Sequence, residues 1–165
     1  MNSISTIKCF GCGGVVPVIE GDTHEYILSA PGCWQIYSEV LAKDYGEYGY
    51  PFVHRITVDG YAVQHPGKPV RKAVQSVAVH LISLFYIFEK NYGSSMATQA
   101  MRRALLSKDV FTWLEPPTNM GEITIVDIAK TASFIEYEDM VYKWGKSVWN
   151  AWSIHHNQIR KWANP

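Results

Sequence analysis

The chain has 165 residues, of which 47% are hydrophobic and 13% aromatic, so it can bury a large core and is not a disordered protein. Lysine and arginine together number 15, as do aspartate and glutamate, which excludes the strong positive charge that draws proteins to nucleic acids or anionic membranes. The length suits a single domain over residues 1–165. Because the N-terminus lacks a signal-peptide pattern and no apolar stretch has the length of a membrane span, we expect a cytoplasmic protein.

The character of the chain changes near residue 33. Residues 1–33 are rich in glycine and proline, which predicts a small head made of turns and short extended pieces. Apolar residues then recur at helical spacing over residues 32–45, and Gly46 is a suitable end for that helix. Residues 52–65 contain Val, Ile and Thr, which favour strand, but they end before Pro66 as a helix does. We interpret them as a helix.

The rest of the chain predicts further helices. Residues 69–90 carry apolar side chains along one side and form the clearest helix. Pro116 and Pro117 exclude regular helix in the segment around them. Ser133 and Glu136 have the spacing of a capping box, from which we expect a helix that runs almost to the C-terminus. The other predicted helical pieces cover residues 94–106 and 123–130.

These elements predict a mainly α fold. We expect a helical bundle formed by residues 34–165, and a small Cys/His zinc-binding N-terminal loop region, residues 1–33, packed on it. No internal repeat or domain linker interrupts this pattern, so the two parts are expected to form one domain.

Three cysteines and one histidine are spaced as Cys9-x2-Cys12-x11-His24-x8-Cys33. Two residues between Cys9 and Cys12 let both sulfurs face one ion, and the glycines that follow allow the turn of a zinc knuckle. Cys33 is expected at the start of a helix, where the N-terminus stabilises the thiolate that a metal requires. We therefore predict zinc bound by Cys9, Cys12, His24 and Cys33. Since the protein would fill all four positions, such a site is structural and not catalytic.

Two other interpretations of the cysteines stay open at this stage. In one, Cys33 is a small buried hydrophobic residue, and Cys9 and Cys12 are an exposed inert pair. In the other, Cys-x-x-Cys is a thioredoxin-like redox site, although such a motif should follow a strand and open a helix, whereas two glycines follow Cys12. The odd number of cysteines argues against a disulfide framework.

Polar residues of the helical body are candidates for a catalytic site. A bundle can bring their three segments together, and facing helices commonly hold a second metal or an acid–base pair. The alternative is that each histidine is a core residue hydrogen-bonded to a neighbour, and no HExxH motif selects ligands among them. The candidates are Asp59, His65, His80, His155 and His156. Tryptophans of the last helix likewise either line an aromatic pocket or pack in the core; they are Trp144, Trp149 and Trp152.

Seven short motifs run through the chain: Cys9-x-x-Cys12-Gly13, Thr23-His24-x-Tyr26, Pro31-Gly32-Cys33-Trp34, Asp59-x-Tyr61-x-x-Gln64-His65-Pro66-Gly67, Ser76-Val77-x-Val79-His80-Leu81, Trp113-Leu114-x-Pro116-Pro117 and Trp149-x-Ala151-Trp152-x-x-His155-His156. Together they resemble an uncharacterised bacterial family, a domain of unknown function, over nearly the whole chain. The resemblance implies that the knuckle, the two turns and the helical histidine positions belong to one recurring pattern. It implies no established reaction. The chain departs from the pattern at Gly60, where Ala is expected and where glycine weakens a helix.

The sequence favours a zinc-binding protein in which the metal is structural and the helical body binds a small molecule or a protein partner. The alternative is a metal- or His/Asp-dependent hydrolase or transferase, with a pocket around Asp59, His65, His80 and His155. A zinc-assisted nucleic-acid-binding module is a third hypothesis, disfavoured because it needs a basic face. The motifs of P-loop and dinucleotide-binding proteins and of serine hydrolases do not occur in the sequence.

Overall fold

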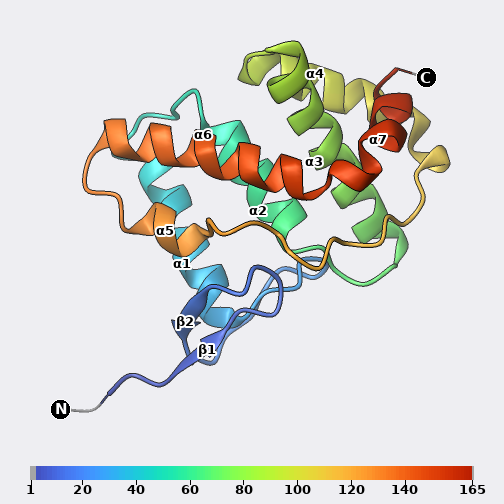
Figure 1. The fold of residues 1–165 in the computed structure, drawn as a ribbon. Helices are drawn as coiled ribbons and strands as arrows, with labels where there is room; N and C mark the ends of the chain where they lie inside the picture. Colours follow the sequence, from blue (N-terminus) through green and yellow to red (C-terminus); the bar gives the residue numbers. More distant parts are fainter. Residues whose placement is uncertain (1–2, 165) are drawn as a thin grey trace.

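Helices form most of the structure, a computed structural model that describes residues 3–164 (Figure 1). The mainly α fold class is therefore confirmed. In chain order the helices are α1 (Pro31–Tyr45), α2 (His54–Gln64), α3 (Arg71–Lys90), α4 (Ser94–Ala104), α5 (Ile125–Ala129), α6 (Phe134–Ala151) and α7 (His156–Ala163), with 3₁₀ turns η1 (Leu105–Val110) and η2 (Ser153–His155). None of the helices within residues 3–164 combines the length and the apolar character that a membrane span requires.

The head contains a two-stranded antiparallel hairpin. Strand β1 (Thr6–Lys8) pairs with β2 (Val15–Pro17), with Ile7 opposite Val16. Figure 1 shows this hairpin at one end of the molecule, next to the start of α1. The contact there requires a residue without a side chain, because a Cβ atom on Gly32 would lie 2.2 Å from the carbonyl oxygen of Pro17. Gly32 thus lets the hairpin lie directly against the first turn of α1.

The core of the body forms around α2, which packs against α3 and α6. Its β-branched residues do not prevent the helix, because burial between two neighbouring helices outweighs their preference for strand. The side chain of Gln64 is fully buried and joins three parts of the chain: it accepts a hydrogen bond from Trp144 Nε1 at 3.0 Å and donates to the carbonyls of Met120 and Ile123. Gly60 faces the Trp144 ring, and α2 is continuous through it.

The prediction of one helix from residue 133 almost to the C-terminus is wrong at Trp152. The N–H of Trp152 donates to the carbonyls of both Val148 and Trp149, which tightens the helix into a 3₁₀ turn before α7 begins. The fully buried Trp152 ring donates from Nε1 to the carbonyl of Val63 at 3.1 Å. The break between α6 and α7 therefore lies at the residue whose ring contacts α2.

The N-terminus of α6 is capped as its sequence predicts. Ser133 Oγ accepts a hydrogen bond from the N–H of Glu136 at 3.2 Å. The Glu136 carboxylate accepts one from the N–H of Ala132, one residue before the N–H that a complete capping box would use. The cap fixes the start of the long helix that carries Trp144 and Trp152 into the core.

Candidate metal centre

The Cys-x-x-Cys segment forms a tight turn with both sulfurs inside. The N–H of Cys9 donates to the carbonyl of Gly14 at 2.8 Å, and the N–H of Gly13 donates back to Cys9 at 3.0 Å. Gly13 has φ of 75°, a value that glycine adopts without strain. Cys9 and Cys12 are only 4% and 9% exposed. The turn thus presents two buried thiols on one side, as the knuckle pattern predicts.

Cys33 lies in the first turn of α1 and is fully buried. The helix begins with Pro31 at its first position, where a missing N–H costs nothing. Cys33 Sγ lies 3.9 Å from Cys12 Sγ. The helix start therefore delivers the third sulfur to the two from the knuckle.

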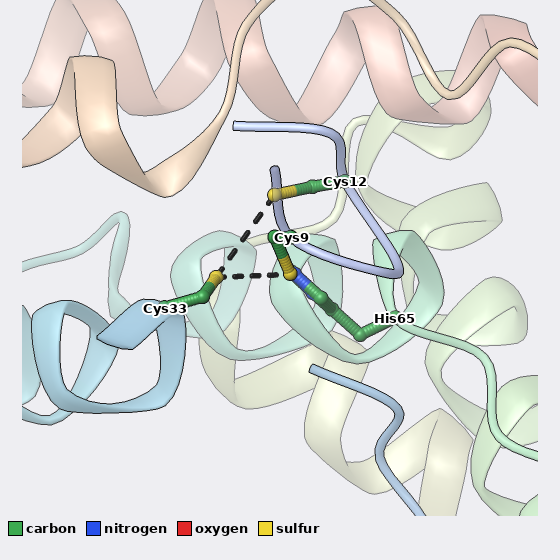
Figure 2. Close-up of side chains that lie close together, drawn as sticks. All are labelled: Cys9, Cys12, Cys33 and His65. Atoms are coloured by element: carbon green, nitrogen blue, oxygen red, sulfur yellow. Dashed lines mark hydrogen bonds between the residues drawn. The ribbon is translucent and has the colours of Figure 1, made fainter. Parts of the chain in front are cut away.

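The fourth donor comes from the C-terminal end of α2. His65 directly follows the helix, is fully buried, and places Nε2 at 3.4 Å from Cys33 Sγ. Its Nδ1 lies 2.8 Å from the carbonyl oxygen of Tyr61. Because a carbonyl only accepts hydrogen bonds, Nδ1 carries the proton and Nε2 keeps its lone pair for the cysteine cluster. Figure 2 shows the four side chains directed toward one another from these three segments.

The four donor atoms have the spacing of a tetrahedral site. All lie within 4.8 Å of one another. An ion with Zn–S distances of about 2.3 Å places its sulfur ligands about 3.8 Å apart in a tetrahedron. The 3.9 Å between Cys12 and Cys33 and the 3.4 Å between Cys33 and His65 agree with that arrangement. Cys9, Cys12, Cys33 and His65 are therefore grouped closely enough to hold one metal ion.

Each ligand atom also has an outer partner that orients it. The N–H of Ala30 donates to Cys9 Sγ, the N–H of Gly14 to Cys12 Sγ, and the hydroxyl of Tyr61 to Cys33 Sγ, each at 3.4 Å. Such donors stabilise negative charge on sulfur and fix its direction, as the outer shells of metal sites do. Tyr61 acts twice, because its carbonyl also orients His65.

The close approach of the knuckle to His65 depends on Gly11. A Cβ atom at this position would lie 2.6 Å from His65 Cδ2 and 2.7 Å from the carbonyl oxygen of Leu28. The N–H of Leu28 in turn donates to the carbonyl of His65 at 3.2 Å. His65 is thus held against the head by two features, the close approach of Gly11 and the backbone hydrogen bond from Leu28.

Three thiols packed this closely do not ionise independently. Hydrogen bonds from Cys12 and Cys33 lower the pKa of Cys9 far below its usual range. The hydrogen bond with Cys33 acts to lower the pKa of Cys12, but the bond to Cys9 and burial outweigh it and raise that pKa to about 12. Hydrogen bonds to Cys12 and Cys9, together with burial, also raise the pKa of Cys33. Within the cluster these contacts thus favour the thiolate form at Cys9 and the thiol form at Cys12 and Cys33.

The structure places the fourth predicted ligand, His24, outside this group. The N–H of Tyr26 approaches His24 Nδ1 at 3.5 Å, and the His24 ring packs against the rings of Tyr26 and Trp34. His24 is half-buried on the outer side of the head. The sequence assigned it to the ligand set because it lies between Cys12 and Cys33, whereas the packing of α1 beside α2 brings His65 there instead.

One comparison with known proteins decides the family. A family model described as "Family of unknown function (DUF5946)" matches residues 7–153. The chain belongs to this family. The match includes all four residues of the cluster, and it confirms the resemblance to a domain of unknown function. Neither a curated protein nor a solved structure matches the chain.

The other candidate residues of this family member are distributed over separate places. His80 Nδ1 lies 2.7 Å from Asp59 Oδ1 between α2 and α3. His155 Nε2 donates to the carbonyl of Glu115, and His156 Nε2 donates to the carbonyl of Trp149, each at 2.8 Å. Because His65 belongs to the cysteine cluster, the structure does not gather the histidines into one centre. Only Asp59 and His80 of that group form a pair.

Asp59 is the centre of a buried polar network. The carboxylate is fully buried and accepts hydrogen bonds from Arg55 Nε at 2.9 Å, Arg55 Nη2 at 2.6 Å and the hydroxyl of Ser83. His80 is 17% exposed and lines a surface pocket of about 390 Å³ together with Lys72 and Ser76. Asp59 thus holds the His80 ring from its buried side, and His80 also lines the pocket.

Sequence reasoning missed a second pair of the same kind. His54 Nδ1 lies 2.9 Å from Asp44 Oδ2, and Asp44 also accepts a hydrogen bond from Tyr137. The available signal was Asp44 and His54 at the two ends of a short aromatic loop.

The tryptophans follow the second of the two interpretations offered for them, core packing. Trp144, Trp149 and Trp152 lie in the core and are at most 3% exposed.

Proposed function

We propose that this protein binds one zinc ion through Cys9, Cys12, Cys33 and His65. The observation that carries the proposal is the convergence of three sulfurs and one imidazole nitrogen within 4.8 Å, with His65 Nδ1 engaged by a carbonyl. Thiolate and imidazole ligands in a tetrahedron suit zinc, whereas oxygen-rich sites suit magnesium or calcium. A dication at the centre also favours thiolate over thiol at each sulfur.

The role of this ion is structural. All four tetrahedral positions are taken by side chains that are at most 9% exposed, so no position is open to water or a substrate. The ion would join three segments: the knuckle, the start of α1 and the end of α2. The strands of the head are three residues long and are marginal without such a link. The metal would therefore fix the head on the helical body.

Elemental analysis of the purified protein and its variants tests this assignment. We expect one zinc per chain in the wild type and a large loss of zinc in Cys12→Ser and His65→Ala. His24→Ala and His80→Ala are matched controls, since they remove the same imidazole from places outside the cluster, and both should retain zinc. Retained zinc in His65→Ala, or its loss in His24→Ala, would contradict the ligand set. Cobalt substitution should also produce a thiolate charge-transfer band that Cys12→Ser weakens.

A second candidate function is acid–base chemistry by His80 in a hydrolytic or transfer reaction. The observation that favours it is the Asp59–His80 contact of 2.7 Å, beside a pocket that His80 itself lines. A carboxylate on Nδ1 fixes the imidazole so that its other nitrogen can take up or deliver a proton. A small molecule is the ligand that this pocket suits in size.

Turnover of a panel of p-nitrophenyl esters and phosphate esters tests the second candidate. We expect activity that His80→Gln abolishes while the zinc content stays unchanged. His24→Gln serves as the control because His24 lies apart from any carboxylate network and should leave turnover intact. Absence of turnover across the panel, or activity that survives His80→Gln, counts against an acid–base role. Neither result affects the assignment of the metal site.

A further inference from the structure

A second surface pocket lies at the other end of the Asp59 network. Its volume is about 450 Å³, within the range of pockets for small molecules. It lies between the start of α2, the loop before it and α4. Its charged and imidazole side chains are Arg55, Arg102 and His54, and no aspartate or glutamate lines it. We infer that this pocket binds a small phosphate monoester whose organic group packs against an aromatic rim.

Arg55 is held in position before a ligand arrives. Its Nε and Nη2 atoms donate to Asp59, and its side chain is only 14% exposed. A guanidinium fixed in this way loses little conformational freedom on binding and still has unused N–H donors on its other edge. Arg102 belongs to the exposed face of α4 and forms no ion pair within residues 3–164. Arg55 and Arg102 therefore offer an anion one cation that is held in place and one that is free to move.

The carboxylates nearest to this pocket lie behind the donors. Asp59 is fully buried beneath Arg55, and Asp44 is fully buried beneath His54, whose Nδ1 it orients at 2.9 Å. A ligand would meet the N–H groups at contact distance and the carboxylates only in the layer behind them. Carboxylates so placed orient donors toward an anion, as they do in the outer shells of phosphate and metal sites.

The α4 side of the pocket presents hydroxyl and backbone donors. Ser94, Ser95 and Thr98 line it. The hydroxyl of Thr98 already donates to the carbonyl of Ser94 at 2.9 Å, so the hydroxyl donors for a ligand come from the two serines. Gly93 precedes the helix without a side-chain cap, so the first N–H groups of α4 are free for an acceptor from outside the helix. Phosphoryl oxygens are multivalent acceptors, and this combination of guanidinium, hydroxyl and helix N–H groups is the chemistry that binds them.

The rim supplies the observation that favours an organic phosphate over the free ion. Tyr50 has φ of 62°, a left-handed conformation that is unfavourable for a residue with a side chain. Its N–H donates to the carbonyl of Asp44 at 2.6 Å, and its ring centre lies 4.4 Å from that of His54. Tyr50 and Phe52 are nevertheless 61% and 67% exposed at the pocket. A strained backbone thus holds exposed aromatic surface beside the cationic groups.

Titration of the zinc-loaded full chain with phenyl phosphate, inorganic phosphate and phenol, followed by backbone amide NMR, tests the inference. We expect phenyl phosphate to shift the amide signals of Ser94, Ser95 and Thr98 saturably and to bind more tightly than either other probe. Arg102→Gln should weaken phenyl phosphate roughly tenfold or more, as expected for a charge-assisted hydrogen bond. Arg103→Gln removes the same charge from the neighbouring position, which does not line the pocket, and should leave the affinity unchanged.

Several results would overturn the assignment. Equal losses in Arg102→Gln and Arg103→Gln would reveal nonspecific attraction to the basic side of α4. Inorganic phosphate that binds as tightly as phenyl phosphate would make this a site for the free ion, and phenol that binds as tightly would make it an aromatic site without anion recognition. No saturable shift with up to about 10 mM phenyl phosphate, a concentration at which two charge-assisted contacts should be detectable, would reject the site. Because Arg102 is exposed, its substitution should not affect folding.

Discussion

The cysteine cluster and the Asp59 network both bury polar side chains, but they do so in opposite ways. In the network, the Asp59 carboxylate meets four protein donors from Arg55, His80 and Ser83, so its charge is satisfied within the fold. In the cluster, three sulfurs and one nitrogen lie within 4.8 Å of one another. The comparison teaches that an oxygen partner on one ring nitrogen does not distinguish the two histidines, because His65 has a carbonyl and His80 a carboxylate on Nδ1. What makes His65 a ligand candidate is that its Nε2 faces the cysteine sulfurs.

The two regions should also depend differently on metal. The helical body has a continuous core around α2, α3 and α6 that includes the fully buried Trp144 and Trp152. The head contributes a short hairpin and the knuckle. Hydrophobic burial can maintain the body, whereas the head relies on cross-links to it. Loss of the metal should therefore destabilise the head, whereas disruption of the Asp59 network should destabilise the helical body.

The largest expected effect follows from removal of the metal. Structural zinc contributes about 10 kcal/mol or more of binding free energy to the folded form of small domains. A strong chelator should therefore release amide protection in the head and around His65, with a large drop in melting temperature, while most helical circular dichroism remains. Hydrogen exchange measured by mass spectrometry separates the two regions. Loss of protection that begins in α3 or α6 instead would contradict the independence of the body.

A smaller effect is expected from Asp59→Ala. The change leaves Arg55 and His80 with polar groups near the core and no acceptor, and removal of one partner from a buried ion pair costs about 3–5 kcal/mol. Urea denaturation should show this loss of unfolding free energy, and the zinc content should stay at the wild-type level. Asp109→Ala is the matched control because Asp109 pairs with Arg71 at the surface, where its side chain is 96% exposed. A zinc loss in Asp59→Ala would show that the two regions are coupled.

The sequence predicts three of the four cluster residues because their signals are local. Two cysteines separated by two residues before glycine form a knuckle from turn geometry alone, and Cys33 follows Pro31 and Gly32 at a recognisable helix start. His65 has no such signal. Its approach to Cys33 depends on how α1 and α2 pack, across the intervening aromatic loop, and this packing is not encoded in the spacing of ligands. His24 lies at a suitable spacing but is surrounded by aromatic rings.

The fold shows the same division between local and tertiary information. Helices with one apolar side are predictable from their periodicity, and α3 is an example. The end of α3 at Asn91 is also predictable, because asparagine tolerates the left-handed conformation found there. The break at Trp152 is not predictable from periodicity, because the apolar stripe continues into α7. It arises from a hydrogen bond between Trp152 and Val63, which are far apart in the sequence.

The smallest expected effect distinguishes two glycines that lie at the same helix interface. Gly60 on α2 and Gly145 on α6 are both buried, but a Cβ atom on Gly60 would lie 3.6 Å from the Trp144 ring, whereas one on Gly145 would lie 2.3 Å from Ile56 Cγ2. Gly60→Ala should therefore stabilise the protein by roughly 0.5–1 kcal/mol through lower chain entropy in the unfolded state. Gly145→Ala should destabilise it by about 1–3 kcal/mol through overpacking.

Urea denaturation of both glycine variants measures this difference in sign, with zinc content as the check that the head is unaffected. The resemblance noted in the sequence predicts Ala at position 60, and the ordinary contact distance from Trp144 explains why Ala would fit there. Destabilisation by Gly60→Ala would mean that the interface between α2 and α6 is tighter than these distances indicate. It would also mean that Gly60 is required for packing. If Gly60→Ala stabilises and Gly145→Ala destabilises, the close approach of the two helices depends on Gly145, and the α2 backbone that carries Asp59 tolerates a methyl group beside it.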